Sequence, residues 1–411
     1  MKTDIDRIME EHNLDALLVT GAAQHNPAMV YFTGNGHISQ AELVKRRDAE
    51  PVLFSNAMER DEAARTGLTT RNLADYRFPD LLKQVEGNVL KATILRYRNM
   101  LSDLEITSGR VAIYGMVDAG SSYAIFSGLR DVLPDLDIVG ELDDSVLLWA
   151  MATKDSAEVE RIRRMGKITT QVVEKVADFL TSQRVRDEML VDREGSPVTI
   201  GDVKGLINLW LMERDAENPE GTIFAIGRDA GVPHSAGNPK DPLRLGQTII
   251  FDIFPCESGG GYFYDFTRTW CLGYATDAAQ SLYEDVHSVY QQIMGELKVD
   301  NLCPEYQMRT CKLFEERGHA TIQSNPQTEE GYVHSLGHGV GLHIHERPWF
   351  RSNAVPADRL VPGSVVTIEP GLYYPERGLG VRLEDTVWVR PDGKMEILAE
   401  YPMDLILPIK G

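Results

Sequence analysis

The chain has 411 residues, of which 43% are apolar and 25% are charged, and this composition is ordinary for a soluble globular protein. Its 62 acidic residues outnumber its 42 basic residues, and the net charge of −20 disfavours nucleic acid and anionic membranes as partners, because both are polyanions. Domains usually contain about 100–200 residues, so this length predicts two or three of them.

The N-terminal part of the chain alternates between helical patterns and short apolar runs. It opens without an apolar core of signal-peptide length, and no stretch of about 18 apolar residues follows, so we expect a cytoplasmic protein without a membrane span. Helical spacing is present at 3–12 and 80–93. Apolar runs that end in Gly, Asn or polar residues are typical of buried strands, and they lie at 14–21, 29–34, 51–56 and 111–115. This alternation predicts an α/β domain.

The pattern changes at residue 153, where a long amphipathic helix is expected. Asp155 or Ser156 would cap its N-terminus. Apolar residues recur at steps of three and four, which predicts one buried stripe along the helix, made of Val159, Ile162, Met165, Ile168, Val172, Val176 and Leu180. We place a domain boundary just before this helix. Further helices are expected at 200–214, 277–297 and 303–317, and strands cluster at 247–273 and 364–400.

Two aspartates flank a glycine turn within 247–273. The midpoint between Asp252 and Asp265 falls inside the Ser-Gly-Gly-Gly turn at 258–261. A hairpin that folds there would place the two aspartates opposite each other, with Cβ atoms about 4.5–5.5 Å apart. Two half-buried carboxylates at that separation repel each other, and a bound cation would relieve the repulsion.

Two glutamates repeat this arrangement within 364–389. The midpoint between Glu369 and Glu384 falls in the Pro-Glu-Arg-Gly turn at 375–378, again between apolar strands. A salt-bridged strand face would explain either hairpin alone. Two hairpins of the same design favour a metal site.

Histidines supply a third element of the predicted site. His334, His338, His343 and His345 lie within twelve residues, between glycines that permit close backbone approach, and His234 stands alone in a Gly- and Pro-rich loop. Four carboxylates with one or two imidazoles suit Mn, Co, Fe or Zn in a two-metal site. The four cysteines lack zinc-finger spacing and are expected to be reduced thiols, and neither a P-loop nor a GxSxG motif is present.

Five ordered motifs resemble the signature of the M24 metallopeptidases, the pita-bread family that includes prolidase, aminopeptidase P, methionine aminopeptidase and creatinase. They are PHSAGNP, FDIFP with YDFTRT, HSLGHGVGLHIHE, TIEPGLYY and VRLEDTV. The leading segment, DALLVT with VYFTGN, resembles the N-terminal domain of the prolidase, aminopeptidase P and creatinase branch. The resemblance implies a creatinase- or prolidase-like α/β domain at 1–152 and an α+β pita-bread catalytic domain at 153–411.

The resemblance also implies a centre of two divalent metal ions, with Mn, Co or Zn expected and Fe as a further candidate. Asp252 would bind the first ion, and His338 and Glu369 would bind the second. Asp265 and Glu384 would bridge both ions.

The remaining site residues follow from the same resemblance. His234 and His345 would orient the substrate and stabilise the oxyanion, and Glu369 would transfer the proton. His334 and Arg382 match positions near the substrate in the proline-specific branch. The resemblance thus implies hydrolysis of Xaa-Pro bonds at peptide N-termini, with a short peptide as the binding partner and a homodimer as the assembly.

Two departures from the family pattern concern spacing and specificity. The interval from Asp252 to Asp265 is two residues longer than usual, and an even increment leaves both side chains on one face of the sheet. Prolidases of the microbial type tend to have an arginine shortly after the HE dipeptide, but here Trp349 occupies that position between Arg347 and Arg351. Xaa-Pro aminopeptidase and Xaa-Pro dipeptidase activity therefore both stay open.

Other activities on the same fold form the alternative. A creatinase-like hydrolase or a metal-dependent lyase of a small zwitterion would use the same architecture. The resemblance implies that creatinase-type enzymes and non-catalytic relatives lack the full ligand set, so the five ligand positions retained here disfavour both. A metal-dependent lyase would keep these ligands and stays open as an alternative.

Overall fold

The structure, a computed structural model, describes residues 4–34, 36–351 and 358–409. The chain forms two compact units. The N-terminal unit comprises Met1–Met151 together with Gly259–Gly261, and the C-terminal unit comprises Ala152–Ser258 and Tyr262–Gly411. Within the described residues, no helix is both long enough and apolar enough to span a membrane.

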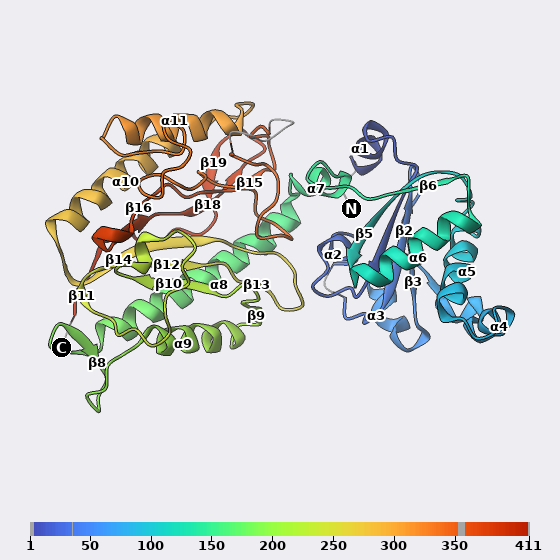
Figure 1. The fold of residues 1–411 in the computed structure, drawn as a ribbon, viewed down its shortest axis with the longest axis horizontal. Helices are drawn as coiled ribbons and strands as arrows, with labels where there is room; N and C mark the ends of the chain where they lie inside the picture. Colours follow the sequence, from blue (N-terminus) through green and yellow to red (C-terminus); the bar gives the residue numbers. More distant parts are fainter. Residues whose placement is uncertain (1–3, 35, 352–357, 410–411) are drawn as a thin grey trace. The chain divides into compact units, whose positions relative to one another are not determined.

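The N-terminal unit is built on a six-stranded mixed sheet with the order β4-β3-β2-β1-β5-β6. Its strands are β1 (Ala16–Gly21), β2 (Ala41–Arg46), β3 (Val52–Ser55), β4 (Thr69–Asn72), β5 (Gly109–Met116) and β6 (Leu136–Val139). Its helices are α1 (Ile5–Glu11), α2 (Pro27–Thr33), α3 (Arg60–Arg65), α4 (Phe78–Gln84), α5 (Val89–Ser102), α6 (Ala119–Val132) and α7 (Val146–Met151), with short 3-10 helices η1 (Ala57–Glu59) and η2 (Leu73–Tyr76). Helices α5 and α6 lie side by side (Figure 1). The predicted α/β class is confirmed for this unit.

Two predicted elements of this unit differ from the structure. The apolar run 29–34 was expected as a strand but lies in α2, because Pro27 begins that helix and the Asn26 side chain accepts a hydrogen bond from the Met29 N–H at 3.4 Å. The helical pattern at 80–93 divides into α4 and α5, since the chain turns at Glu86 and Gly87, which both have positive φ. The other predicted strands are confirmed as β1, β3 and β5.

The C-terminal unit combines several small sheets with long helices. Its helices are α8 (Ser156–Thr181), α9 (Ile200–Met212), α10 (Asp277–Glu296) and α11 (Cys303–Glu315), with η3 (Asp229–Gly231) and η4 (Pro375–Arg377). Its strands are β7 (Arg184–Arg186), β8 (Met189–Val191), β9 (Ala216–Glu217), β10 (Thr222–Ile226), β11 (Leu245–Gly246), β12 (Thr248–Ile253), β13 (Cys256–Glu257), β14 (Phe266–Ala275), β15 (Val365–Ile368), β16 (Gly371–Tyr374), β17 (Leu379–Arg382), β18 (Asp385–Val389), β19 (Met395–Ile397) and β20 (Ile406–Leu407).

These strands form the central layer of the C-terminal unit. The largest sheet has the order β10-β12-β14-β11 with β20 beside β14, and a second sheet has the order β15-β18-β19. Figure 1 shows α10 and α11 on one side of the strands and α8 and α9 on the other. The predicted α+β class is confirmed for this unit. Its four cysteines are buried free thiols, at Cys256, Cys271, Cys303 and Cys311.

Helix α8 forms as the sequence predicts and supports the strands of the site. The Asp155 side chain accepts hydrogen bonds from Ala157 N–H and Glu158 N–H, and the Glu158 side chain bonds back to Asp155 N–H. Gly166 lets the helix approach the Tyr264 ring, since a Cβ there would lie 2.6 Å from that ring. The stripe is buried at Val159, Ile162, Met165, Val172, Val176 and Leu180, whereas Ile168 is only half-buried.

Candidate metal centre

The first predicted hairpin forms, but the predicted register is wrong by two residues. Antiparallel strands β12 and β14 pair Asp252 with Thr267 and not with Asp265. The hairpin turns within residues 258–261, because Glu257 N–H donates to the Tyr262 carbonyl at 3.1 Å, and Gly259 and Gly260 in this loop have φ angles of +87° and +81°. Asp265 therefore lies diagonally across from Asp252, and the even offset keeps both side chains on one face.

The second predicted hairpin is confirmed in its register. Antiparallel pairing of β15 with β18 brings Ile368 beside Asp385, and β16 pairs with β17 in the same register. Glu369 therefore lies opposite Glu384, between the two paired segments.

Thr267 joins the two hairpins. Glu384 N–H donates to the Thr267 carbonyl at 3.0 Å, and the Thr267 hydroxyl donates to Glu384 Oε2 at 2.6 Å. Thr267 is not among the sequence-predicted site residues. Its position two residues after Asp265 was the available signal, because alternate residues of a strand share a face.

His338 reaches the carboxylates from an irregular segment between α11 and β15. Its Nε2 lies 3.6 Å from Asp265 Oδ2 and 3.4 Å from Glu369 Oε1. The backbone holds it there, since Thr367 N–H donates to the His338 carbonyl at 2.8 Å. On the other side of the ring, Nδ1 lies 3.0 Å from the Gly339 carbonyl. A proton on Nδ1 satisfies that carbonyl and leaves the Nε2 lone pair free to bind a metal ion.

The cluster has the properties of a cation site. Ligand atoms of Asp265, His338 and Glu384 all lie within 4.8 Å of one another. Burial and the charge of Asp252 raise the pKa of Asp265, and burial and the charge of Asp265 raise the pKa of Glu384. Two further oxygens, Asp252 Oδ1 and Glu384 Oε1, are buried without a hydrogen-bond partner among the residues that the structure describes. Partnerless carboxylate oxygens beside an imidazole nitrogen fit a divalent cation.

Arg382 fixes the orientation of Asp252. Its Nη2 donates to Asp252 Oδ2 at 2.5 Å, and its Nη1 donates to the Tyr373 hydroxyl at 2.8 Å and to the Pro233 carbonyl at 3.2 Å. The Arg382 side chain is 1% exposed. The guanidinium thus occupies one oxygen of Asp252 and leaves Oδ1 as the oxygen without a partner.

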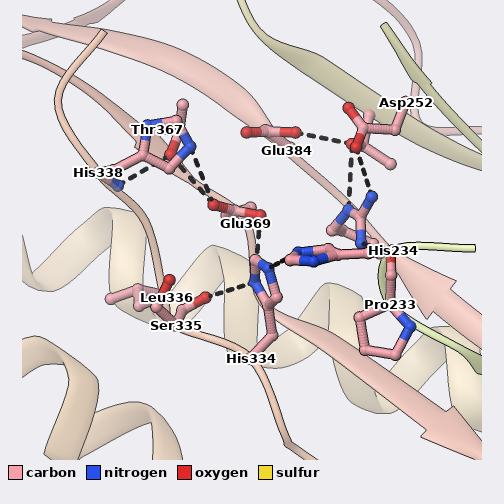
Figure 2. Close-up of polar contacts among 12 residues, drawn as sticks. Pro233, His234, Asp252, His334, Ser335, Leu336, His338, Thr367, Glu369 and Glu384 are labelled. Atoms are coloured by element: carbon pink, nitrogen blue, oxygen red, sulfur yellow. Dashed lines mark hydrogen bonds and ion pairs between the residues drawn. The ribbon is translucent and has the colours of Figure 1, made fainter. Parts of the chain in front are cut away.

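The remaining predicted histidines also lie at this cluster. His234 and His334 approach with their Nε2 atoms 3.0 Å apart, and Figure 2 shows Glu369 between His338 and His334. His334 Nδ1 lies 3.4 Å from Glu369 Oε2. The His345 ring centroid lies 4.3 Å from that of His338. Desolvation and the charge of His338 lower the pKa of His345 to about 4, so its imidazole is neutral at pH 7.

Comparison with known proteins adds sequence and fold relatives. The chain matches metallopeptidase family M24 over residues 160–391 and the creatinase/prolidase N-terminal domain over residues 3–142. It is 28% identical to the Xaa-Pro dipeptidase of Pyrococcus furiosus over 285 residues, which cover 68% of this chain and 69% of that protein.

Solved structures share the fold over nearly the whole chain. A dipeptidase from Pyrococcus horikoshii superposes with a TM-score of 0.73 at 20% identity and covers 98% of both chains. An X-Pro aminopeptidase from Thermotoga maritima has the same TM-score of 0.73 at 20% identity, over 97% of this chain and 99% of the other. These likenesses confirm the predicted fold, an α/β domain followed by an α+β pita-bread domain.

Proposed function

The chain belongs to metallopeptidase family M24, and we propose that it hydrolyses Xaa-Pro bonds at the N-termini of peptides. One observation carries this proposal: Asp265, His338 and Glu384 offer ligand atoms within 4.8 Å of one another in a buried cluster. The Xaa-Pro specificity of the relatives supports the choice of substrate. Asp252, Asp265, His338, Glu369 and Glu384 are proposed as ligands of two divalent ions, which when bound would lower the pKa of a water molecule and polarise the scissile carbonyl.

Glu369 is the proposed proton carrier. Burial alone would raise the pKa of Glu369, but the neighbouring His334, His338 and Arg382 side chains outweigh burial and lower that pKa below its ordinary value. The carboxylate is therefore ionised and can accept the proton of the attacking water. The leaving proline nitrogen has no amide hydrogen, so Glu369 would deliver that proton to it.

Histidines would stabilise the charge that develops on the carbonyl oxygen. His345 is neutral at pH 7, and a neutral imidazole can donate one ring N–H to an oxyanion. His234 and His334 share a nitrogen–nitrogen contact of 3.0 Å, so one ring donates and the other accepts. This contact would orient both rings toward the substrate. Arg382 would help to hold the site in place by orienting the Asp252 carboxylate.

Residues after His345 bear on substrate length. Arg347 is 1% exposed and its Nη1 donates to Asp358 Oδ1 at 2.7 Å. The Arg351 guanidinium stacks over the Trp349 ring, 4.9 Å from its centroid. Both arginines are engaged by neighbouring side chains, and Trp349 occupies the position where prolidases of the microbial type tend to have an arginine that could hold the carboxylate of a dipeptide. We therefore expect tripeptides to be cleaved at least as fast as dipeptides.

Four further features are proposed with their supporting observations. Hard oxygen ligands favour Mn, Co or Zn, with Fe as another candidate.

The domain boundary is proposed between residues 152 and 153, beside the end of the N-terminal unit at Met151. The four free thiols suit the reducing cytoplasm. A homodimer is proposed from the family resemblance.

The experiment is a length series with defined metals. Chelated protein is reloaded with Mn, Co or Zn and offered Ala-Pro, Ala-Pro-Ala and longer Ala-Pro peptides, with Ala-Ala-Ala as the control. We expect release of the N-terminal residue from the proline peptides alone, and only after a metal is added. A metal-loaded protein that cleaves none of them would contradict the proposal, and turnover of a small zwitterion would favour a lyase or a creatinase-like hydrolase.

A further inference from the structure

A buried ion pair lies directly beside His345. The Lys154 ammonium contacts Glu346 Oε1, and the two side chains are 1% and 0% exposed. Glu346 follows His345 in the sequence, whereas Lys154 lies just before α8. The two partners are 192 residues apart, so no local sequence pattern reveals the pair.

Backbone pairing links Glu346 to the predicted metal ligand His338. Glu346 and Gly339 exchange hydrogen bonds in both directions, each of 2.9 Å, and Gly339 also bridges to Val366 on β15. Adjacent residues on an extended segment point to opposite faces. His345 consequently lies edge-on to His338, whereas the Glu346 side chain is buried in the protein interior.

The Glu346 carboxylate is packed against the loop that carries His345. His343 N–H lies 3.3 Å from Glu346 Oε2, and a Cβ at Gly341 would lie 2.3 Å from Glu346 Oε1. Such close packing means that a displacement of the carboxylate displaces the loop backbone as well.

Lys154 is itself held in place by its main chain. Its N–H donates to the Gly363 carbonyl at 2.8 Å, and the preceding Thr153 bridges to Ser364. Lys154 therefore connects the start of the C-terminal unit and the strand region before β15 to the segment that presents His345.

We propose that Lys154 is a positioning residue that holds His345 in place through Glu346. The inference rests on the proposed function, in which His345 contacts the scissile carbonyl. A buried carboxylate that loses its cation is strongly unfavourable, so it takes up a proton or moves toward water, and either change alters its present contacts. Glu346 cannot make that move without shifting His345, and a displacement of about 1 Å in a catalytic group can cost about 10²-fold in rate.

A double-mutant cycle separates positioning from a general structural role. Lys154→Met, His345→Ala and the double variant are compared with wild type on Ala-Pro-Ala. Lys154→Met should lower kcat by about 10–100-fold with little change in KM and with unchanged metal content. In the His345→Ala background, the same substitution should add no further loss, because residues that act as one unit are not additive. Additive losses would overturn the inference.

Lys45 offers a matched control. It is a lysine with 1% side-chain exposure, ion-paired with Asp6 at 2.5 Å in the N-terminal unit. Lys45→Met should leave kcat unchanged, and Lys154→Arg should recover part of the lost rate because it keeps the cation. If Lys154→Met does not fold, Glu346→Gln removes the same charge pair and should show the same lack of additivity with His345→Ala.

Hydrogen exchange provides a readout that does not depend on turnover. The Glu346 N–H is bonded to the Gly339 carbonyl, so its exchange should become faster in Lys154→Met and stay unchanged in Lys45→Met. If Lys154→Met keeps the wild-type kcat and the wild-type exchange rate while His345→Ala is impaired, the role of Lys154 is overturned and the proposed function is not. A wild-type protein without Xaa-Pro activity would instead reject the proposed function and the role of Lys154 with it.

Discussion

His234 and His334 lie with their Nε2 atoms 3.0 Å apart, although 100 residues separate them in the sequence. One ring nitrogen must donate and the other must accept, so the contact contains a single proton. His334 Nδ1 lies 3.4 Å from Glu369 Oε2 on the far side of its ring. His234 is thereby connected to the proposed proton carrier through one intervening imidazole.

We expect His234→Ala to lose about 10²–10³ in kcat on Xaa-Pro peptides, the usual loss when one positioned oxyanion donor is removed. The side chain is exposed, so thermal stability should stay within about ±0.5 kcal/mol and both metal ions should remain bound. Steady-state kinetics and metal analysis check this, with His287→Ala on α10 as the control. Wild-type turnover would place His234 outside the site and weaken the proline-specific assignment.

Asp265→Asn should abolish metal-dependent activity, because Asp265 is assigned to both ions. Its fold should persist, since removal of one acid relieves repulsion among the buried carboxylates when no metal is bound. Metal content and thermal denaturation of the chelated proteins measure these two effects. Two tightly bound ions together with full activity in this variant would refute the ligand assignment.

Glu42 should make the protein less stable as the pH rises toward neutrality. Glu42 is 2% exposed on β2, and burial raises its pKa from 4.5 to about 7, even though Thr20, Tyr97 and Arg96 favour the ionised form. A folded-state pKa above the unfolded value means that the native state holds the proton more tightly. The stabilisation is complete below pH 4.5 and is lost as the pH passes through about 7, a change of roughly 3 kcal/mol.

Glu42→Gln isolates this effect, because glutamine does not titrate. The difference in free energy of unfolding between the variant and wild type should change by roughly 3 kcal/mol between pH 4 and pH 8 in favour of the variant. Denaturant unfolding at several pH values measures it. A difference that is constant across this range would show that Glu42 has the same pKa in the folded and the unfolded protein, and would contradict the raised pKa.

Gly166→Ala on α8 should destabilise the protein, although alanine is the better helix former by about 1 kcal/mol. The added Cβ would lie 2.6 Å from the Tyr264 ring and 2.9 Å from the Ala399 Cβ, so the helix must shift away from the segment that contains Tyr264 and Asp265. Gly205→Ala on α9 is the matched control, because no atom lies within 4 Å of its Cβ position, and it should stabilise the protein by up to about 1 kcal/mol. Thermal midpoints of the two variants that move in the same direction would contradict this packing argument.

Local spacing predicted most of the elements. Helix α8 follows from its apolar period and its Asp155 cap, and the Glu369–Glu384 pairing follows from a turn with Pro375 and Gly378 at its ends. The Asp252–Asp265 register was wrong because the side-chain pattern is compatible with a turn centred at either of two neighbouring positions. In the structure Glu257 pairs with Tyr262 and residues 258–261 form the loop, and the run of three glycines in that loop does not specify which residues close it.

Contacts between segments that are distant in the chain could not be predicted from the sequence. The approach of His234 to His334 depends on how η3 and the segment after α11 pack in three dimensions, and Lys154–Glu346 depends on the meeting of the chain before α8 with the His345 loop. Only the family resemblance suggested a role for His234. Lys154 had no signal of any kind, since a single lysine before a helix is ordinary.

All four cysteines lie in the C-terminal unit, between Cys256 and Cys311, and burial raises the pKa of each thiol. A thiol reagent attacks the thiolate, so the native protein should be inert to it and modification should require an opening of this unit. The N-terminal unit contains no cysteine in its sequence. The rate of alkylation would therefore measure local unfolding of the C-terminal unit, which carries the candidate metal centre, and would not respond to unfolding of the N-terminal unit. Comparing this rate with and without added metal would show how far a bound ion rigidifies the C-terminal unit, without any measurement of activity.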